Sequence, residues 1–232
     1  MIRARAIVVV AIVSGAAPAS AAPASAAPAT APASAAPPAS LVSGEAAHGA
    51  AIDPVLALFK LERMSCKFSE DKHVALLARP LRSTGTIHFQ RGQGIARTTL
   101  TPRRQQVVLT PTTLRIRKDA HVEEVPLDKS KDLKAFALIF PTLLRGDRAE
   151  LERAFELGLY GGAEGWWALT FTPRTDSLRK LVRRVVVFGR KGEVVALQVA
   201  EASGDTTDTR LSDVHTNADV PDAEIAAAFG AP

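Results

Sequence analysis

Residues 86–91 read Thr-Ile-His-Phe-Gln-Arg, so polar and apolar side chains alternate along this stretch. Successive side chains of a β-strand point to opposite faces of the sheet. Ile87, Phe89 and Arg91 are therefore predicted to share one face of a strand. This alternation, in place of the three- to four-residue spacing of a helix, indicates that the middle of the chain is built from β-structure.

Similar strand-like runs follow on the C-terminal side of this stretch. Turn signals such as Thr101-Pro102 and Thr110-Pro111 separate them, and the segments 190–192 and 203–205 are short enough to close hairpins. After the first strand, the predicted strands span residues 95–100, 105–110, 114–118, 122–126, 157–160, 166–172, 181–189, 193–201 and 206–214. The sequence therefore predicts an antiparallel meander of about ten or eleven strands.

A few helices are expected beside the strands, which makes the predicted class mainly β with helices (α+β). Asp53-Pro54 is typical of a helix start, because the carboxylate can cap free amides and proline suits the first turn. A second, strongly apolar helix should kink at Pro141, which lacks an amide donor. The predicted helices span about residues 53–65, 132–144, a short stretch after Asp147 that carries Leu151 and Phe155, and residues 221–229.

The N-terminal quarter of the chain has a different composition. Two arginines, a short apolar run and a small-x-small site ending at Ala21 predict a cleavable signal peptide over residues 1–21, and hence export to the periplasm. Residues 22–52 are rich in Ala, Pro and Ser, which bury little surface and favour a disordered tether. The folded domain is expected over residues 53–232. Cleavage would lower the formal charge from +5 to +3.

Several functional classes lack support in the sequence. The basic residues are scattered among acidic ones instead of forming a patch with aromatic residues, which argues against nucleic-acid binding. HExxH, GxSxG and Walker A motifs are absent, and the SxxK match at Ser177–Lys180 has no partner motif. No histidine spacing suits a metal, and Cys66 is interpreted as a small buried hydrophobe. We therefore expect no enzyme activity, cofactor or metal.

One group of apolar side chains can lie on a single face of the sheet, opposite the strongly apolar helix predicted over residues 133–144. An ordinary packed core and a ligand cavity would both explain this pattern. The strand members of this face are Phe68, Ile87, Phe89, Val107, Leu109, Leu114, Ile116, Trp167, Leu169, Phe171, Val185 and Val187. By strand parity, Trp167 is expected inside and Trp166 outside.

The order of several short motifs resembles a known protein family. These motifs are Phe68-Ser69-Glu70-Asp71-Lys72, residues 80–89 followed by Arg91, Thr101-Pro102, residues 143–147, residues 167–173 and residues 204–207. Together they resemble the periplasmic outer-membrane lipoprotein carrier family, LolA, over roughly residues 53–230. Gly92 stands where typical members have proline, and the aromatic-rich strands are missing, so the chain resembles the divergent LolA-like proteins of aryl polyene and other envelope-lipid gene sets.

The resemblance implies an open antiparallel β-barrel with a helical lid over an apolar concave face. It implies a carrier of the acyl chains of lipoproteins or related lipids, with an inner-membrane releasing transporter and an outer-membrane acceptor as partners; we expect a monomer. The alternative is a non-transporting sensor or accessory module of the same fold. Arg91 would be a lid latch. Helical cavity-lining residues would be Phe136, Ile139, Phe140 and Leu143, added to the strand residues named above.

Overall fold

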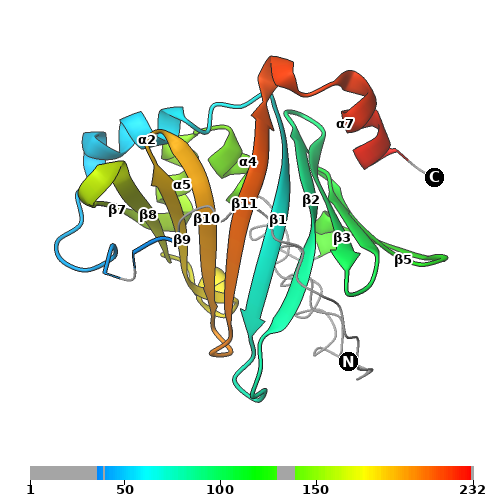
Figure 1. Cartoon of the computed structure of the whole chain (residues 1–232), viewed down its shortest axis with the longest axis horizontal. Coiled ribbons are helices and arrows are strands. Elements are labelled where there is room, and N and C mark those ends of the chain that lie inside the picture. The colour runs from blue at the N-terminus through cyan, green and yellow to red at the C-terminus, as the bar shows by residue number, and fades with distance from the viewer. Residues whose placement is uncertain (1–35, 39, 130–138, 231–232) are drawn as a thin grey trace.

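The computed structural model describes residues 36–38, 40–129 and 139–230. Within them, eleven strands form one antiparallel sheet in the order β6-β5-β4-β3-β2-β1-β11-β10-β9-β8-β7 (Figure 1). The strands are β1 (Arg63–His73), β2 (Leu81–Gln90), β3 (Gly94–Thr101), β4 (Gln105–Leu109), β5 (Thr113–Lys118), β6 (His121–Pro126), β7 (Phe155–Gly161), β8 (Trp166–Pro173), β9 (Val182–Arg190), β10 (Glu193–Glu201) and β11 (Thr206–Thr216). The predicted open antiparallel sheet is confirmed.

Short helices accompany the sheet. They are η1 (Gly49–Ile52), α2 (Asp53–Ala57), η2 (Leu127–Lys129), α4 (Ile139–Leu144), α5 (Arg148–Ala154), η3 (Ala163–Gly165), α6 (Asp176–Arg179), η4 (Asn217–Asp219) and α7 (Asp222–Phe229). Helices α2, α4 and α5 lie over the concave face, whereas α7 lies on the other side of the sheet (Figure 1). The expected final helix is confirmed.

The predicted first helix is wrong beyond its first turn. It ends at Ala57, and β1 begins at Arg63. The apolar side chains Met64, Cys66 and Phe68 are spaced by two, and they lie buried on one face of β1. β1 pairs with β2 on one side and β11 on the other, and these two ladders outweigh the local helical pattern.

Two further features of the described residues differ from the sequence prediction. The helix after Asp147 ends at Ala154, and Phe155 opens β7 instead of belonging to the helix. Asp147 caps α5 as expected, because its carboxylate accepts a hydrogen bond from the amide of Glu150. The four-residue helix α6 was not predicted; Thr175 caps it by accepting from the amide of Leu178. Most of the predicted apolar helix at 132–144, including its Asp132 start, lies outside the described residues.

The two expected hairpin turns are present. Lys191 and Gly192 form the two-residue turn between β9 and β10 with φ values of 48° and 85°. Positive φ at both positions matches the twist of the flanking strands. The tight turns position β9, β10 and β11 side by side, and so place their inward side chains over one continuous surface.

Residues 40–52, which composition assigned to the tether, pack against the folded part of the chain. Leu41 is buried against Trp166 on the outer face of the sheet. Ala47 exchanges backbone hydrogen bonds with Leu159 of β7, and Ile52 is fully buried in the main core. The ordered domain therefore begins before Asp53. Residues 1–35 are outside the described part, so the signal peptide stays a prediction.

Candidate functional site

The concave face of the sheet gathers the apolar residues that the sequence analysis singled out. Phe68, Phe89, Val107, Leu109, Leu114, Ile116, Leu143, Trp167, Leu169 and Phe171 are all buried in one cluster, and half-buried Ile87 packs against it. Val185 and Val187 belong to the same cluster. Phe136 lies outside the described residues, and the side chains of Ile139 and Phe140 are not described although both residues are in α4.

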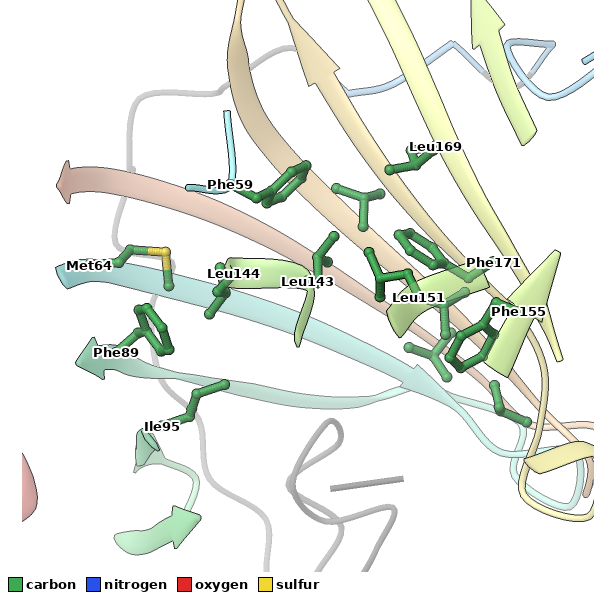
Figure 2. Packing of buried hydrophobic residues seen from close by; sticks show 14 of the residues in the cluster. Phe59, Met64, Phe89, Ile95, Leu143, Leu144, Leu151, Phe155, Leu169 and Phe171 are labelled. Carbon is green, nitrogen blue, oxygen red and sulfur yellow. The ribbon is translucent and has the colours of Figure 1, made fainter. Parts of the chain in front are cut away.

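Side chains of the helices complete this cluster. Figure 2 shows Leu143, Leu144 and Leu151 of α4 and α5 lying over the sheet, between side chains of β1–β3 and side chains of β7–β8. Phe59, which follows α2, packs edge-on against Trp167 with ring centroids 6.4 Å apart. Sequence reasoning did not include Met64, Phe155 or Leu157 in this face. The parity of β1 and β7 identifies them once those strands are recognised.

The two neighbouring tryptophans lie on opposite faces of β8, as strand parity predicts. Trp167 belongs to the concave cluster, whereas Trp166 belongs to the outer cluster with Phe188 and Leu41. Arg190 lies over the Trp166 ring, 5.5 Å from its centroid. The indole of Trp167 is thus the one placed to report on the concave face.

Cys66 lies on β1, not at the end of a helix as the sequence suggested, and its side chain is buried in the concave cluster. Burial raises the pKa of its thiol to about 12, opposed by a smaller effect of a backbone hydrogen bond from Ile87. The thiol therefore stays protonated at neutral pH and is a poor nucleophile. The structure supports its interpretation as a small buried hydrophobe.

A buried charged cluster lies on the same face of β1, beyond Phe68. The guanidinium of Arg97 donates two hydrogen bonds of 3.0 Å to the Glu70 carboxylate, which also accepts from the hydroxyls of Ser83 and Thr209. Arg97 also stacks on the Phe68 ring, 4.1 Å from its centroid. Such a bidentate pair with further hydrogen bonds can offset the cost of burying both charges.

A second buried ion pair lies further along the same strand. The ammonium of Lys72 donates to the carboxylate of Glu201 on β10 at 2.7 Å, and both side chains are 7% exposed. Sequence reasoning missed both pairs, because the predicted strands did not include β1, on which Glu70 and Lys72 share a face with Phe68. The concave surface is therefore apolar over most of its area and ionic toward the β1–β2 turn.

Arg91 lies in the turn directly after β2, with its side chain 34% exposed. Its guanidinium donates to the carbonyl oxygen of Leu61 at 2.8 Å and pairs with the Glu62 carboxylate at 2.8 Å, and its amide donates to the Glu62 carbonyl. These partners belong to the segment that joins α2 to β1. Arg91 therefore ties the turn between β2 and β3 to the segment that follows α2.

The outer face carries a separate polar cluster under α7. Glu224 accepts hydrogen bonds from the hydroxyl of Ser65 and, at 3.0 Å, from Nε2 of His88. These bonds, that of Ser65 first, hold the pKa of Glu224 below its ordinary value despite partial burial. At the last residue of α7, Phe229, a partly open pocket of about 160 Å³ is also lined by Gln93, Val108, Thr110, Thr113, Arg115 and Glu124.

Two features are absent from the part of the chain that the structure describes. No group of three or more His, Cys, Asp or Glu side chains among the described residues is arranged to hold a metal ion. None of the helices described combines the length and the apolar character that a membrane crossing requires.

Fold and site together define an open antiparallel sheet whose apolar concave face is covered by short helices, which is the architecture of a carrier of apolar groups. The chain belongs to the LolA-like outer membrane lipoprotein carrier protein family, whose sequence pattern matches residues 45–230. No curated protein matches the chain.

Among solved structures, the chain is similar to a LolA superfamily protein, NE2245, from Nitrosomonas europaea, with 13% identity, a TM-score of 0.39 and coverage of 73% of this chain and 94% of that chain. It is also similar to LprF from Mycobacterium bovis, with 12% identity, a TM-score of 0.37 and coverage of 77% and 97%. A complex of MucA and MucB from Pseudomonas aeruginosa matches with 12% identity, a TM-score of 0.40 and coverage of 75% and 58%.

Proposed function

We propose that the protein carries the acyl chains of lipoproteins or related envelope lipids across the periplasm, from the inner toward the outer membrane. This proposal rests on the way in which short helices cover the apolar concave face of the sheet. Residues 139–144 of α4 contribute to that cover, together with two very short helices: α2, of five residues, and α5, of seven. Helices this short are not stable alone, so their position depends on the side chains they bury.

The lid could be displaced at moderate cost. Arg91 holds the segment after α2 through a hydrogen bond to one carbonyl, worth about 1.5–3 kcal/mol, and an exposed ion pair with one carboxylate, worth about 0–1 kcal/mol. Burying one methylene of an acyl chain contributes about 0.8 kcal/mol. A few methylenes therefore offset the loss of the latch, and entry of a long chain would favour the open lid. Release would allow the helices to cover the face again.

Binding of a fluorescent long-chain fatty acid to the purified protein tests this proposal. We expect saturable binding at one site, accompanied by a change of tryptophan emission. The emission change should be lost in Trp167→Tyr and kept in Trp166→Tyr, because only Trp167 is in the concave cluster. A protein with a solid core would show no saturable binding, and that result would reject the carrier.

Transport is tested separately from binding. Mass spectrometry of lipids that copurify from the periplasm should detect acylated species. Loaded protein should then pass its cargo to acceptor membranes faster than the cargo moves unaided. Binding without any such transfer would favour the non-transporting sensor or accessory module. Sequencing of the mature protein should find Ala22 at its N-terminus if the signal peptide is cleaved as predicted.

A further inference from the structure

The turn between β1 and β2 presents two leucines to solvent. Leu76 is 94% exposed and Leu77 is 46% exposed. Single apolar side chains are common on protein surfaces, but here two adjacent leucines lie at the outermost part of a hairpin. This hairpin protrudes at the end of the molecule away from α7 (Figure 1). The two leucines are therefore placed where a binding partner can contact them before it contacts the rest of the molecule.

The turn is held in place by hydrogen bonds. The amide of Leu77 donates to the carbonyl of Val74 at 2.9 Å. The amide of Ala75 donates to the carboxylate of Asp205, in the β10–β11 hairpin, at 3.1 Å. The two neighbouring hairpin turns are thus tied together, and the leucines are displayed from a supported tip.

Basic side chains surround this tip. Arg79, Arg82, Lys180, Arg183 and Arg184 are all exposed at the same end of the sheet. The strand register joins these segments, because His73 pairs with Thr206 and Glu201 pairs with Val182. The side chain of Arg183 also donates to the carbonyl of Ala202 at 3.3 Å, which places it beside the β10–β11 turn.

The acidic groups at this end do not balance the basic ones. Asp71 pairs with Arg82 at 3.1 Å, and Asp176 pairs with Arg179 at 3.2 Å. Asp205 accepts the Ala75 amide. The end therefore combines two projecting leucines with a surplus of positive charge. We name this surface, formed by residues 74–82, 179–184 and 202–205, the basic tip.

We propose that the basic tip docks on the surface of an anionic lipid bilayer, with Leu76 and Leu77 entering the boundary between headgroups and acyl chains. Moving the leucine side chains out of water at this boundary is favourable in free energy. The long side chains of lysine and arginine can at the same time place their charges beside the negative headgroups. An acidic protein surface would satisfy the charges, but it would not require exposed leucines at the tip. The proposal is independent of the acyl-carrier function, since it concerns other residues.

Vesicle cosedimentation tests the proposal with the purified full domain. The vesicles are pure phosphatidylcholine, or phosphatidylcholine with about a third of phosphatidylglycerol. We expect binding to the anionic vesicles only, weakened by salt because exposed charges are screened. Leu76→Ser should lower the affinity about tenfold, as expected for one leucine returned to water. Lys180→Glu with Arg184→Glu should abolish binding at physiological salt.

Matched variants at the other end of the sheet serve as controls. Val214→Ser removes an apolar side chain that is 43% exposed on β11, and Lys191→Glu reverses a charge in the β9–β10 turn. Both should bind vesicles as the wild type does. The proposal is overturned if anionic vesicles do not bind, if the Leu76 and Val214 variants lose affinity equally, or if only an acidic protein binds the tip. Fatty-acid binding, measured in parallel, should be unchanged in Leu76→Ser.

Discussion

Trp167 and Gly189 lie directly opposite each other on β8 and β9, and the indole covers the glycine so closely that a Cβ at position 189 would be 2.0 Å from the ring. The absence of a side chain at Gly189 therefore creates the space in which Trp167 lies. The same hypothetical Cβ would be 2.5 Å from the carbonyl oxygen of Glu193. Backbone on one side and a large ring on the other leave little room for adjustment.

Gly189→Ala should destabilise the domain by about 1–3 kcal/mol, the usual cost of overpacking a core, and should shift the emission of Trp167. Chemical denaturation followed by tryptophan fluorescence measures both effects. Gly161→Ala is the matched control, because a Cβ on that β7 residue has no atom within 4 Å. Equal stability of the two variants would contradict the close packing of Trp167 on Gly189.

Removing one member of the Arg97–Glu70 pair should be more harmful than removing both. Arg97→Met leaves the buried Glu70 carboxylate without its bidentate partner, and breaking a buried pair costs about 3–5 kcal/mol. The double variant Arg97→Met/Glu70→Leu should recover a large part of that loss. Urea denaturation of the single and double variants checks this order. A double variant that is less stable than both singles would show that the two charges do not act as a pair.

Acid should weaken the attachment of α7 to the sheet. The pKa of Glu224 is lowered in the folded protein from the ordinary 4.5, first by the Ser65 hydroxyl and then by His88. Its stabilising contribution is thus complete above that ordinary value and is lost as the pH falls through the lower folded value. The stability difference between wild type and Glu224→Gln, measured from pH 6 to pH 3, should shrink toward zero. A difference that is constant with pH would contradict this assignment.

The latch role of Arg91 predicts slower release of cargo when the residue is replaced. Arg91→Leu removes the side-chain contacts with the Leu61 carbonyl and the Glu62 carboxylate, so a bound fatty-acid probe should leave more slowly while the fold is retained. Arg91→Lys should give an intermediate off-rate, since a lysine offers a charge without the planar fork. Arg153→Leu, on the exposed side of α5, is the control. Equal off-rates in all variants would mean that Arg91 only closes the turn after β2.

Strand alternation predicted most of the sheet and its inward face, as the positions of Phe89, Leu109 and Leu169 show. It failed at β1, because Val55, Leu58 and Phe59 carry a helical spacing, and the predicted helix was extended to about residue 65, into the strand. The failure also concealed the Arg97–Glu70 pair. These residues are 27 positions apart and meet across β2, so their contact depends on sheet pairing, which no local pattern in either strand encodes.

The first and last strands in chain order, β1 and β11, pair with each other in the middle of the sheet. The meander β2–β6 and the meander β7–β11 are each built from adjacent segments, but they join only when Phe68 meets Leu211 across that central seam. A chain that emerges gradually from its site of synthesis cannot assemble the concave face until its last strand has appeared. Refolding should accordingly be slow for the size of the domain, because this long-range contact must close a large loop. The topology thus postpones the formation of this concave surface until β11 has been made.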